Sequence, residues 1–148
     1  MFAEIDTPRL KLIAFASERV VFAAGQIVFH QGGSPDAAYI VLDGETDALL
    51  ETPAGRIALS RLGPNCIIGE MGVITGAPRS ATVIAATDTT ALRVPREVLL
   101  GLLAEFPQMA LALMRDQIRR IVSAEARLAE ATQGKEPVVV RPVGVEGE

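Results

Sequence analysis

The segment IIGEMGVITGAPRSATV, residues 67–83, places one acid and one base in an otherwise apolar run. Glu70 and Arg79 lie nine positions apart, and the glycines and the proline between them interrupt any regular strand. Gly69 permits a positive φ or a close approach of the backbone to a ligand. Residues 70–76 are numerous enough for one or two turns of helix. The segment therefore predicts a turn and a short helix between two strands.

This arrangement of residues indicates a site for an anion. A helix start carries unpaired N–H groups and partial positive charge, so it attracts negative groups. The turn at Gly76–Pro78 brings Arg79 back toward that start, and its guanidinium matches phosphate in a bidentate way that lysine does not. Ser80 adds a hydroxyl, and the small Ala81 keeps the wall thin. Glu70 can accept a hydrogen bond from a ligand hydroxyl, so the pattern fits a sugar phosphate.

The acid and the base also admit a second interpretation, a solvated ion pair on either side of a turn. Such a surface pair contributes at most about 1 kcal/mol and requires no ligand. The spacing of Glu70 and Arg79 does not by itself decide between an anion site and a surface ion pair.

Short β-rich runs surround this segment, and each begins or ends at a turn signal. Seven or eight strands at a spacing of about eight to twelve residues predict a sandwich, a jelly roll or a barrel. The tetrapeptide LDGE, residues 42–45, predicts a tight hairpin between two of the strands. The runs are VVFAAG (20–25), QIVFHQGG (26–33), AAYIVLDGE (37–45), TDALLETPAG (46–55), RIALSRLG (56–63), ATVIAATD (81–88) and TTALRVP (89–95).

Helical patterns flank the strands. Asp6 or Thr7 can cap a helix over residues 8–17, and REVLLGLLAEF (96–106) reads as a short amphipathic helix. Pro107 begins a longer one, which Gly134 can end. The domain division that follows is one domain over 1–132, with an N-terminal helix over 8–17, a β-roll over 19–94 and C-terminal helices over 95–132, and then a flexible tail over 133–148. VVVR (138–141) offers an alternative in which the tail adds a strand.

The composition limits the classes of function. The chain has 148 residues, of which 49% are hydrophobic and 22% charged, so one domain with a core of Val, Ile, Leu and Ala is expected. A net charge of −4 argues against a nucleic-acid surface. No apolar run reaches the roughly 18 residues of a membrane span, and no signal-peptide pattern opens the sequence. We therefore expect a cytoplasmic protein that does not insert into a membrane.

IGEMGVITGAPRSAT, residues 68–82, resembles the phosphate-binding cassette of the cyclic-nucleotide-binding domain family. That family includes the bacterial catabolite activator protein and the regulatory subunits of cAMP-dependent kinase. The upstream run AAGQIVFHQGGSPDAAYIVLDGE, residues 23–45, is similar to the glycine pattern that precedes the cassette in the family. The resemblance covers roughly residues 8–132. It implies a mainly β fold, an eight-stranded jelly-roll-like β-roll with a short cassette helix and C-terminal lid helices.

The resemblance also implies roles for individual residues. Gly69 and the amides after it, together with Arg79 and Ser80, would bind the cyclic phosphate, and Glu70 would accept a hydrogen bond from the ribose 2′-hydroxyl. The remaining candidates would form the wall or make apolar contacts with sugar and base, and they are Ile67, Ile68, Met71, Gly72, Ala81, Thr82 and Val83. Ser80 and Ile68 resemble the catabolite activator branch, which favours cAMP over cGMP as the ligand.

Other chemistry finds little support in the sequence. His30 is the single histidine, and it reads as a half-buried or turn-capping residue. A metal-dependent cupin needs several histidine ligands, so we expect no metal site. Cys66 is the single cysteine, which excludes a disulfide framework, and its apolar surroundings predict a buried, inert thiol. No Ser-His-Asp or Cys-His set can be assembled, so we expect no enzymatic activity and no cofactor besides the nucleotide.

The last helix carries an apolar stripe at helical spacing. The stripe could cap the mouth of the roll as core, or it could pair two copies of the chain, although its heptad pattern is poor. Its members are Met114, Ile118, Ile121, Ala124 and Leu128. Arg120, Ser123 and Glu125 are the polar positions that could reach a purine edge.

The expected function is therefore that of a cyclic nucleotide receptor. Only sixteen residues follow Thr132, so we expect a sensor without the DNA-binding region that transcription factors of the family carry there. Its signal would pass to a partner protein that recognises the repacked C-terminal helices. The alternative is a protein-interaction module with the same β-roll that no longer binds nucleotide.

Overall fold

The computed structural model describes residue 13 and residues 15–131. The chain divides into two compact units, Met1–Ala112 and Leu113–Glu148. Of the predicted N-terminal helix over 8–17, the described residues 13, 15 and 16 are helical, and the rest of that prediction falls outside the described residues except for a bend at 17. The predicted tail over 133–148, with its alternative strand, and the cap at Gly134 also fall outside them.

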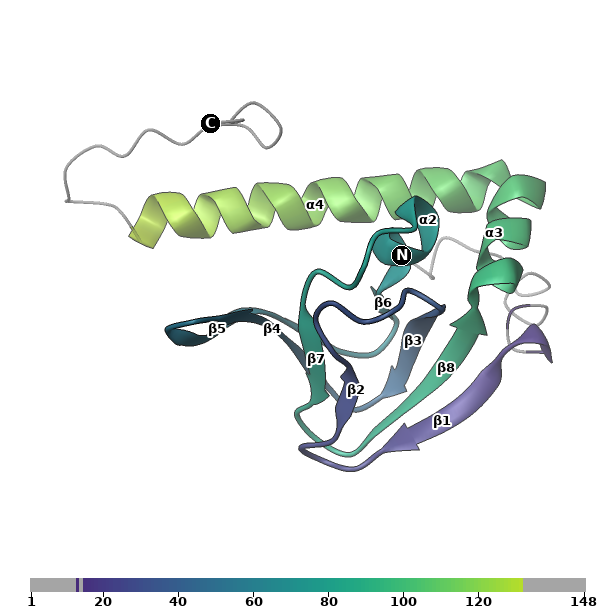
Figure 1. Cartoon of the computed structure of the whole chain (residues 1–148). Coiled ribbons are helices and arrows are strands. Elements are labelled where there is room, and N and C mark those ends of the chain that lie inside the picture. Colours follow the sequence, from purple (N-terminus) through teal and green to yellow (C-terminus); the bar gives the residue numbers. More distant parts are fainter. Residues whose placement is uncertain (1–12, 14, 132–148) are drawn as a thin grey trace. The chain divides into compact units, whose positions relative to one another are not determined.

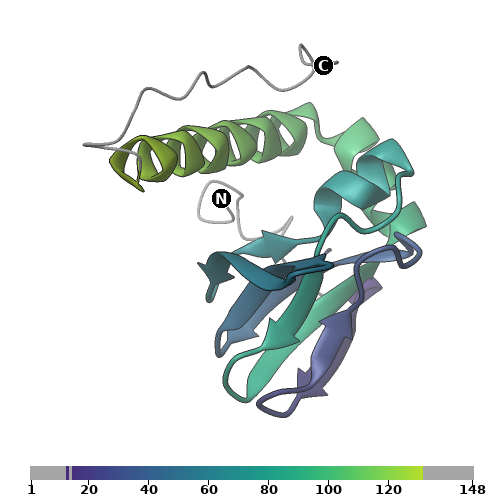
Figure 2. The same ribbon diagram turned by 60° about the vertical axis from the view of Figure 1, so that its left-hand side comes forward.

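The first unit holds two antiparallel sheets of four strands each (Figures 1 and 2). One sheet has the order β1 (Glu18–Phe22), β8 (Thr89–Pro95), β3 (Ala37–Asp43) and β6 (Ile67–Ile68). The other has the order β2 (Ile27–Phe29), β7 (Thr82–Ala85), β4 (Thr46–Thr52) and β5 (Gly55–Leu62). The predicted β-roll is confirmed, and the strand that sequence patterning did not separate is the two-residue β6.

The core of the roll is built of small aliphatic residues and a few aromatic ones. Strand β3 is buried over its first five residues because it lies between β8 and β6 in the sheet. Tyr39 of β3 contacts Phe22 of β1 and Phe29 of β2, and both ring centroids lie 6.1 Å from its own. The aromatic rings thus join strands from the two sheets.

The turn over residues 42–45 is not the predicted hairpin. Strands β3 and β4 belong to different sheets, so the chain crosses from one sheet to the other at this turn. Gly44 has a φ of +92°, and a Cβ there would lie 2.3 Å from the Asp88 carbonyl oxygen. The turn packs against the neighbouring 87–89 turn, and this tertiary contact overrides the local hairpin preference. The hairpin in this region joins β4 and β5, where Thr52 pairs with Gly55.

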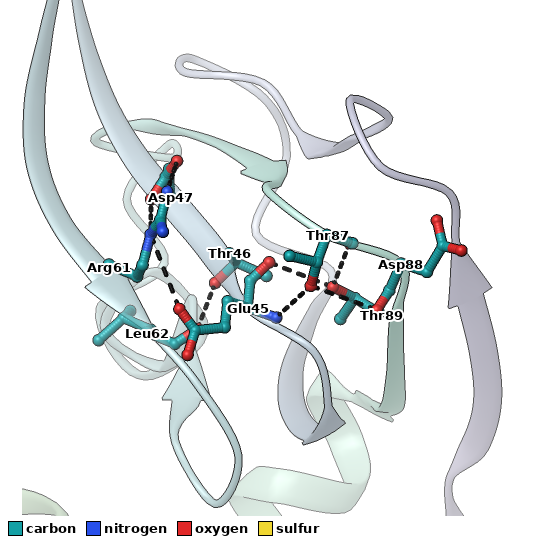
Figure 3. Close-up of polar contacts among 8 residues, drawn as sticks. All are labelled: Glu45, Thr46, Asp47, Arg61, Leu62, Thr87, Asp88 and Thr89. Carbon is teal, nitrogen blue, oxygen red and sulfur yellow. Dashed lines mark hydrogen bonds and ion pairs between the residues drawn. The ribbon is translucent and has the colours of Figure 1, made fainter.

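Hydrogen bonds fasten these two turns together (Figure 3). The Glu45 amide donates to Thr87 Oγ1 at 3.0 Å, and Thr89 Oγ1 donates to the Glu45 carbonyl at 3.2 Å and to the Thr87 carbonyl at 2.8 Å. Thr89 is buried, so its hydroxyl satisfies backbone acceptors that would otherwise be costly to bury. The hydrogen bonds between the two turns therefore stabilise this end of the roll.

The helices follow the predicted boundaries closely. Helix α2 (Glu70–Thr75) begins after Gly69 and ends at Gly76, whose φ of +79° and N–H donation to the Gly72 carbonyl stop it. Helix α3 (Arg96–Glu105) buries Leu99, and α4 (Pro107–Ala131) begins at the predicted proline.

Apolar side chains on the second unit's part of α4 are exposed. Met114, Ile118 and Ile121 are each more than half exposed, and the capping of the roll by this stripe stays a prediction. In the described part of the chain no single helix is long and apolar enough to cross a membrane, and one bent pair, Arg96–Glu105 with Pro107–Ser123, reaches that length and composition together.

Candidate functional site

Arg79 lies inside the roll, between α2 and β7, and only 4% of the residue is exposed. Its Nη1 donates a hydrogen bond to the Gly69 carbonyl at 2.9 Å, and its Nη2 donates to the Ala37 carbonyl. Its Cζ lies 4.0 Å from the centroid of the Phe29 ring. The Nε atom is buried and has no hydrogen-bond partner among the described residues. The Phe29 ring therefore holds one face of the guanidinium, two carbonyls hold its Nη1 and Nη2, and the Nε–H donor is unused.

Charges around Arg79 compensate its burial in part. Asp36 Oδ1 lies 3.6 Å from Arg79 Nη2, and the Asp36 side chain, which is 60% exposed, also pairs with Arg93 at 3.2 Å. Burial lowers the pKa of Arg79, while the negative charge of Asp36, the Tyr39 hydroxyl and then Glu70 act to raise it. Arginine nevertheless stays protonated in proteins. The site thus holds a buried cation beside an Asp36 carboxylate that is largely exposed to solvent, which favours an additional anion.

The backbone at Arg79 is clamped to the loop between β2 and β3. The Gly32 amide donates to the Arg79 carbonyl at 2.7 Å, and the Arg79 amide donates to the Gly33 carbonyl at 3.0 Å. The Gln31 amide donates to Thr82 Oγ1 at 2.9 Å. These three hydrogen bonds join the loop between β2 and β3 to Arg79 and Thr82. The position of Arg79 therefore depends on this loop as well as on the cassette.

Gly69 is required for two separate reasons. Its φ of +80° is a conformation that other residues adopt only with strain, and a Cβ at this position would lie 2.3 Å from Arg79 Nη1 and 3.1 Å from Phe29 Cε2. The sequence predicted either a positive φ or a close approach at Gly69, and both are present. The absence of a side chain is what lets the guanidinium reach the Gly69 carbonyl.

Glu70 begins α2 and is 2% exposed. Its negative charge acts to raise the pKa of Arg79. The interpretation as a solvated ion pair is wrong, because both residues are buried. Two buried ionic groups are costly to maintain for stability alone, so they mark a candidate functional site.

The remaining predicted residues differ in exposure. Ile68 and Val83 belong to the buried core cluster with Tyr39, while Thr82 is buried and uses its hydroxyl on the Gln31 amide. In the other residues of the cassette, Met71 and Ser80 are exposed, Gly72 and Ala81 are partly buried and Ile67 is fully buried.

The three residues predicted to reach the base, Arg120, Ser123 and Glu125, lie in the second unit. Arg120 forms an ion pair with Asp116 at 2.8 Å, and Ser123 is exposed, as is Glu125. Their contact with a purine stays a prediction.

Three side chains of the site escaped the sequence prediction: Phe29, Asp36 and Arg93. Phe29 and Arg93 read as ordinary strand residues, and Asp36 as a loop residue after a proline. Ala37 contributes only its carbonyl oxygen, which no sequence pattern can indicate. The one sequence feature that could have indicated a site residue is the aromatic Phe29, which lies shortly before Gly32 and Gly33.

His30 agrees with one of its two predicted environments, the turn, whereas Cys66 differs from its predicted buried environment. His30 is exposed, and its carbonyl accepts a bond from the Gly33 amide at 2.9 Å, so it belongs to a turn and is not half-buried. Cys66 is partly exposed and not buried. Among residue 13 and residues 15–131, no group of three His, Cys, Asp or Glu side chains is arranged to hold a metal ion.

Known proteins are similar to this chain in sequence and fold. Lysophospholipase nte1 of Neosartorya fischeri is 36% identical over a match of 125 residues that covers 78% of this chain. The chain spans only about 8% of the length of that relative. The catabolite activator protein of Thermus thermophilus superposes with a TM-score of 0.77 at 28% identity, over 88% of this chain and 62% of that one. An EAL enzyme solved in its cAMP-bound form matches with a TM-score of 0.59 at 30% identity, over 78% of this chain and 32% of that one.

The profile of the cyclic nucleotide-binding domain matches residues 19–106, from the first residues of β1 to the end of α3. This span contains both sheets, α2 and Arg79. The matched domain is a regulatory, ligand-binding module, also where it forms a small part of an enzyme. The chain belongs to the cyclic nucleotide-binding domain family.

Proposed function

We propose that this chain is a cyclic nucleotide receptor that binds cAMP in preference to cGMP through Arg79 and Glu70. The observation that carries the proposal is the buried Arg79 guanidinium, which is fixed by backbone carbonyls and an aromatic ring and keeps a buried N–H donor without a partner. A cyclic phosphate supplies the missing anionic acceptor, and charge-assisted bonds of this kind are the strong ones. Glu70 accepts a hydrogen bond from the ribose 2′-hydroxyl.

The preference for cAMP rests on three supports. Ser80 follows the arginine as in the catabolite activator branch, and a relative of known structure was solved in its cAMP-bound form. Ile68 stands where an aromatic residue is common, which also agrees with that branch.

The signal leaves the site through α3. Arg96, the first residue of α3, donates from Nε to the Val73 carbonyl of α2 at 3.1 Å, so the cassette helix and α3 are directly joined. Movement of α2 upon binding would therefore displace α3 and the C-terminal helix, and a cytoplasmic partner protein would recognise the new arrangement.

Calorimetric titration of the purified chain with cAMP, cGMP and 5′-AMP tests the binding step. We expect binding of cAMP, weaker binding of cGMP and none of 5′-AMP, whose open, doubly charged phosphate does not match the cyclic monoanion. The absorbance ratio at 260 and 280 nm of the protein as purified gives a first indication, since the chain has no Trp and one Tyr. If neither cyclic nucleotide binds, the alternative of an interaction module replaces the proposal.

The role of Glu70 has its own test. Glu70→Gln should weaken cAMP binding but leave the affinity for 2′-deoxy-cAMP almost unchanged, because the hydroxyl that Glu70 accepts from is missing there. Equal weakening of both ligands would assign Glu70 to the orientation of Arg79 instead.

Light scattering with and without cAMP measures whether the chain forms the predicted homodimer through its last helix.

A further inference from the structure

Phe29 supports Arg79 in a manner that no hydrogen-bonding residue could. The Arg79 Cζ lies 4.0 Å from the centroid of its ring, within the range of a cation–π contact. The ring is partly buried and leans on Tyr39, with centroids 6.1 Å apart and planes inclined by 38°. It also lies close to Gly69, where a Cβ would come within 3.1 Å of Phe29 Cε2. The guanidinium is thus placed against a ring that is itself held in place.

The nature of this support matters for a ligand. A carboxylate neutralises an arginine by taking its N–H groups, whereas the face of an aromatic ring attracts the cation without using any of them. Arg79 directs Nη1 and Nη2 to the carbonyls of Gly69 and Ala37, and its buried Nε has no partner among the described residues. The ring therefore stabilises the buried charge and leaves a donor for an incoming anion.

We propose that Phe29 is a positioning residue, whose ring fixes the plane of the Arg79 guanidinium so that its Nε–H meets the phosphate of the ligand. The inference rests on the proposed function, since it assigns the support of the same anion site. Phe29 itself need not touch the ligand.

Phe22 provides a matched control. Its ring centroid also lies 6.1 Å from that of Tyr39, and it packs against the same core cluster, but it comes from β1 and makes no cation–π contact with Arg79. Phe22→Leu and Phe29→Leu therefore remove similar aromatic packing, and only the second removes the support of the arginine.

The test titrates cAMP into the wild-type chain, Phe29→Leu and Phe22→Leu, with the unfolding free energy of each measured alongside. We expect Phe29→Leu to weaken binding about five-fold and Phe22→Leu to leave it within two-fold at similar losses of stability. In ¹⁵N NMR spectra, the Arg79 Nε–H resonance should shift when cAMP is added to the wild-type chain, and its position before addition should change in Phe29→Leu but not in Phe22→Leu.

A second variant separates electrostatics from shape and remains informative if Phe29→Leu does not fold. Replacing Phe29 by trifluorophenylalanine keeps the ring but weakens its negative face, so cAMP affinity should fall in the same direction. Unchanged affinity in the fluorinated chain, or equal weakening by Phe22→Leu, would overturn the positioning role. Absence of cAMP binding by the wild-type chain would instead contradict the proposed function.

Discussion

Arg79 and Arg61 are two arginines of the same roll with opposite environments. Arg61 lies on β5 with its side chain 58% exposed, and it donates to both carboxylate oxygens of Asp47, at 2.8 and 3.0 Å (Figure 3). The hydrogen bond that Arg61 donates to Asp47 raises the pKa of Arg61, while burial lowers the pKa of Arg79. Arg61 is thus a neutralised surface cation, and Arg79 is a buried cation with capacity for another anion. The residue type is the same, so the function follows from burial and from the kind of partner.

The largest expected effect is a difference in cAMP affinity between substitutions of these two arginines. Arg79→Lys keeps the charge but cannot reach the Gly69 and Ala37 carbonyls together while facing a phosphate, so affinity for cAMP should fall about 10- to 100-fold. Arg61→Lys should stay within two-fold. Isothermal titration of both variants measures this, and a similar loss in the two would mean that the comparison does not locate the site.

Two glycines extend the comparison to the backbone. Gly69 and Gly25 both have positive φ, at +80° and +89°, but a Cβ at Gly25 meets nothing within 4 Å. Gly69→Ala should lower the unfolding free energy by about 3 kcal/mol, from backbone strain together with the clash against Arg79, and Gly25→Ala by about 1 kcal/mol, from strain alone. Urea denaturation of both variants provides the values. Equal losses would show that Arg79 can move aside at little cost.

Arg79 differs from Arg61 in two properties, its burial and its backbone carbonyl partners. Arg96 has only the second of these properties, so it separates their effects. Like Arg79, it bonds a carbonyl, that of Val73, but like Arg61 the residue is exposed. Arg96→Ala should cost about 1 kcal/mol and should speed hydrogen exchange in α2, whose contact with α3 it loosens. Arg56→Ala, which removes a surface partner of Glu51, is the control. If exchange in α2 is unchanged, the two helices are joined by apolar contacts alone.

The smallest expected effect is the contribution of the Asp47–Arg61 pair to the stability of the fold at low pH. Hydrogen bonding to Arg61 lowers the pKa of Asp47 below its usual 3.8. A carboxylate with a lowered pKa stabilises the fold above its unfolded pKa, and this contribution is lost as pH falls through the folded value. The wild-type chain should therefore lose stability between about pH 4.5 and pH 3 slightly more steeply than Asp47→Asn. Denaturation midpoints at pH 6 and pH 3 measure the difference, and identical slopes would show that this pair contributes nothing.

Local signals in the sequence were sufficient for most of the fold. Glycine and proline positions predicted the strand ends, the short α2 and the restart at Pro107, because turn chemistry and helix capping act over a few residues. The 42–45 turn was mispredicted because its direction depends on the 87–89 turn, which lies far away in the chain.

The candidate site divides in the same way. Gly69, Glu70 and Arg79 are near neighbours in sequence, so their meeting could be predicted. The Ala37 carbonyl, Asp36 and the Phe29 ring approach Arg79 from strands and loops more than forty positions away. A backbone carbonyl has no residue signature, and an aromatic residue in a strand is ordinarily core. Tertiary packing alone assigns them to the arginine.

The distance in sequence between Arg79 and its supports has a consequence for folding. Ala37 of β3 and Arg79 of the loop between α2 and β7 are 42 positions apart, so the anion site is completed only after long loops have closed. Unfolded and half-assembled chains would thus lack affinity for the nucleotide. A ligand that binds only the complete roll raises its unfolding free energy, by about 2.7 kcal/mol at one hundred times the dissociation constant. Under the proposed function, the cyclic nucleotide would then also lengthen the lifetime of this protein, because chains without ligand open more often to proteases.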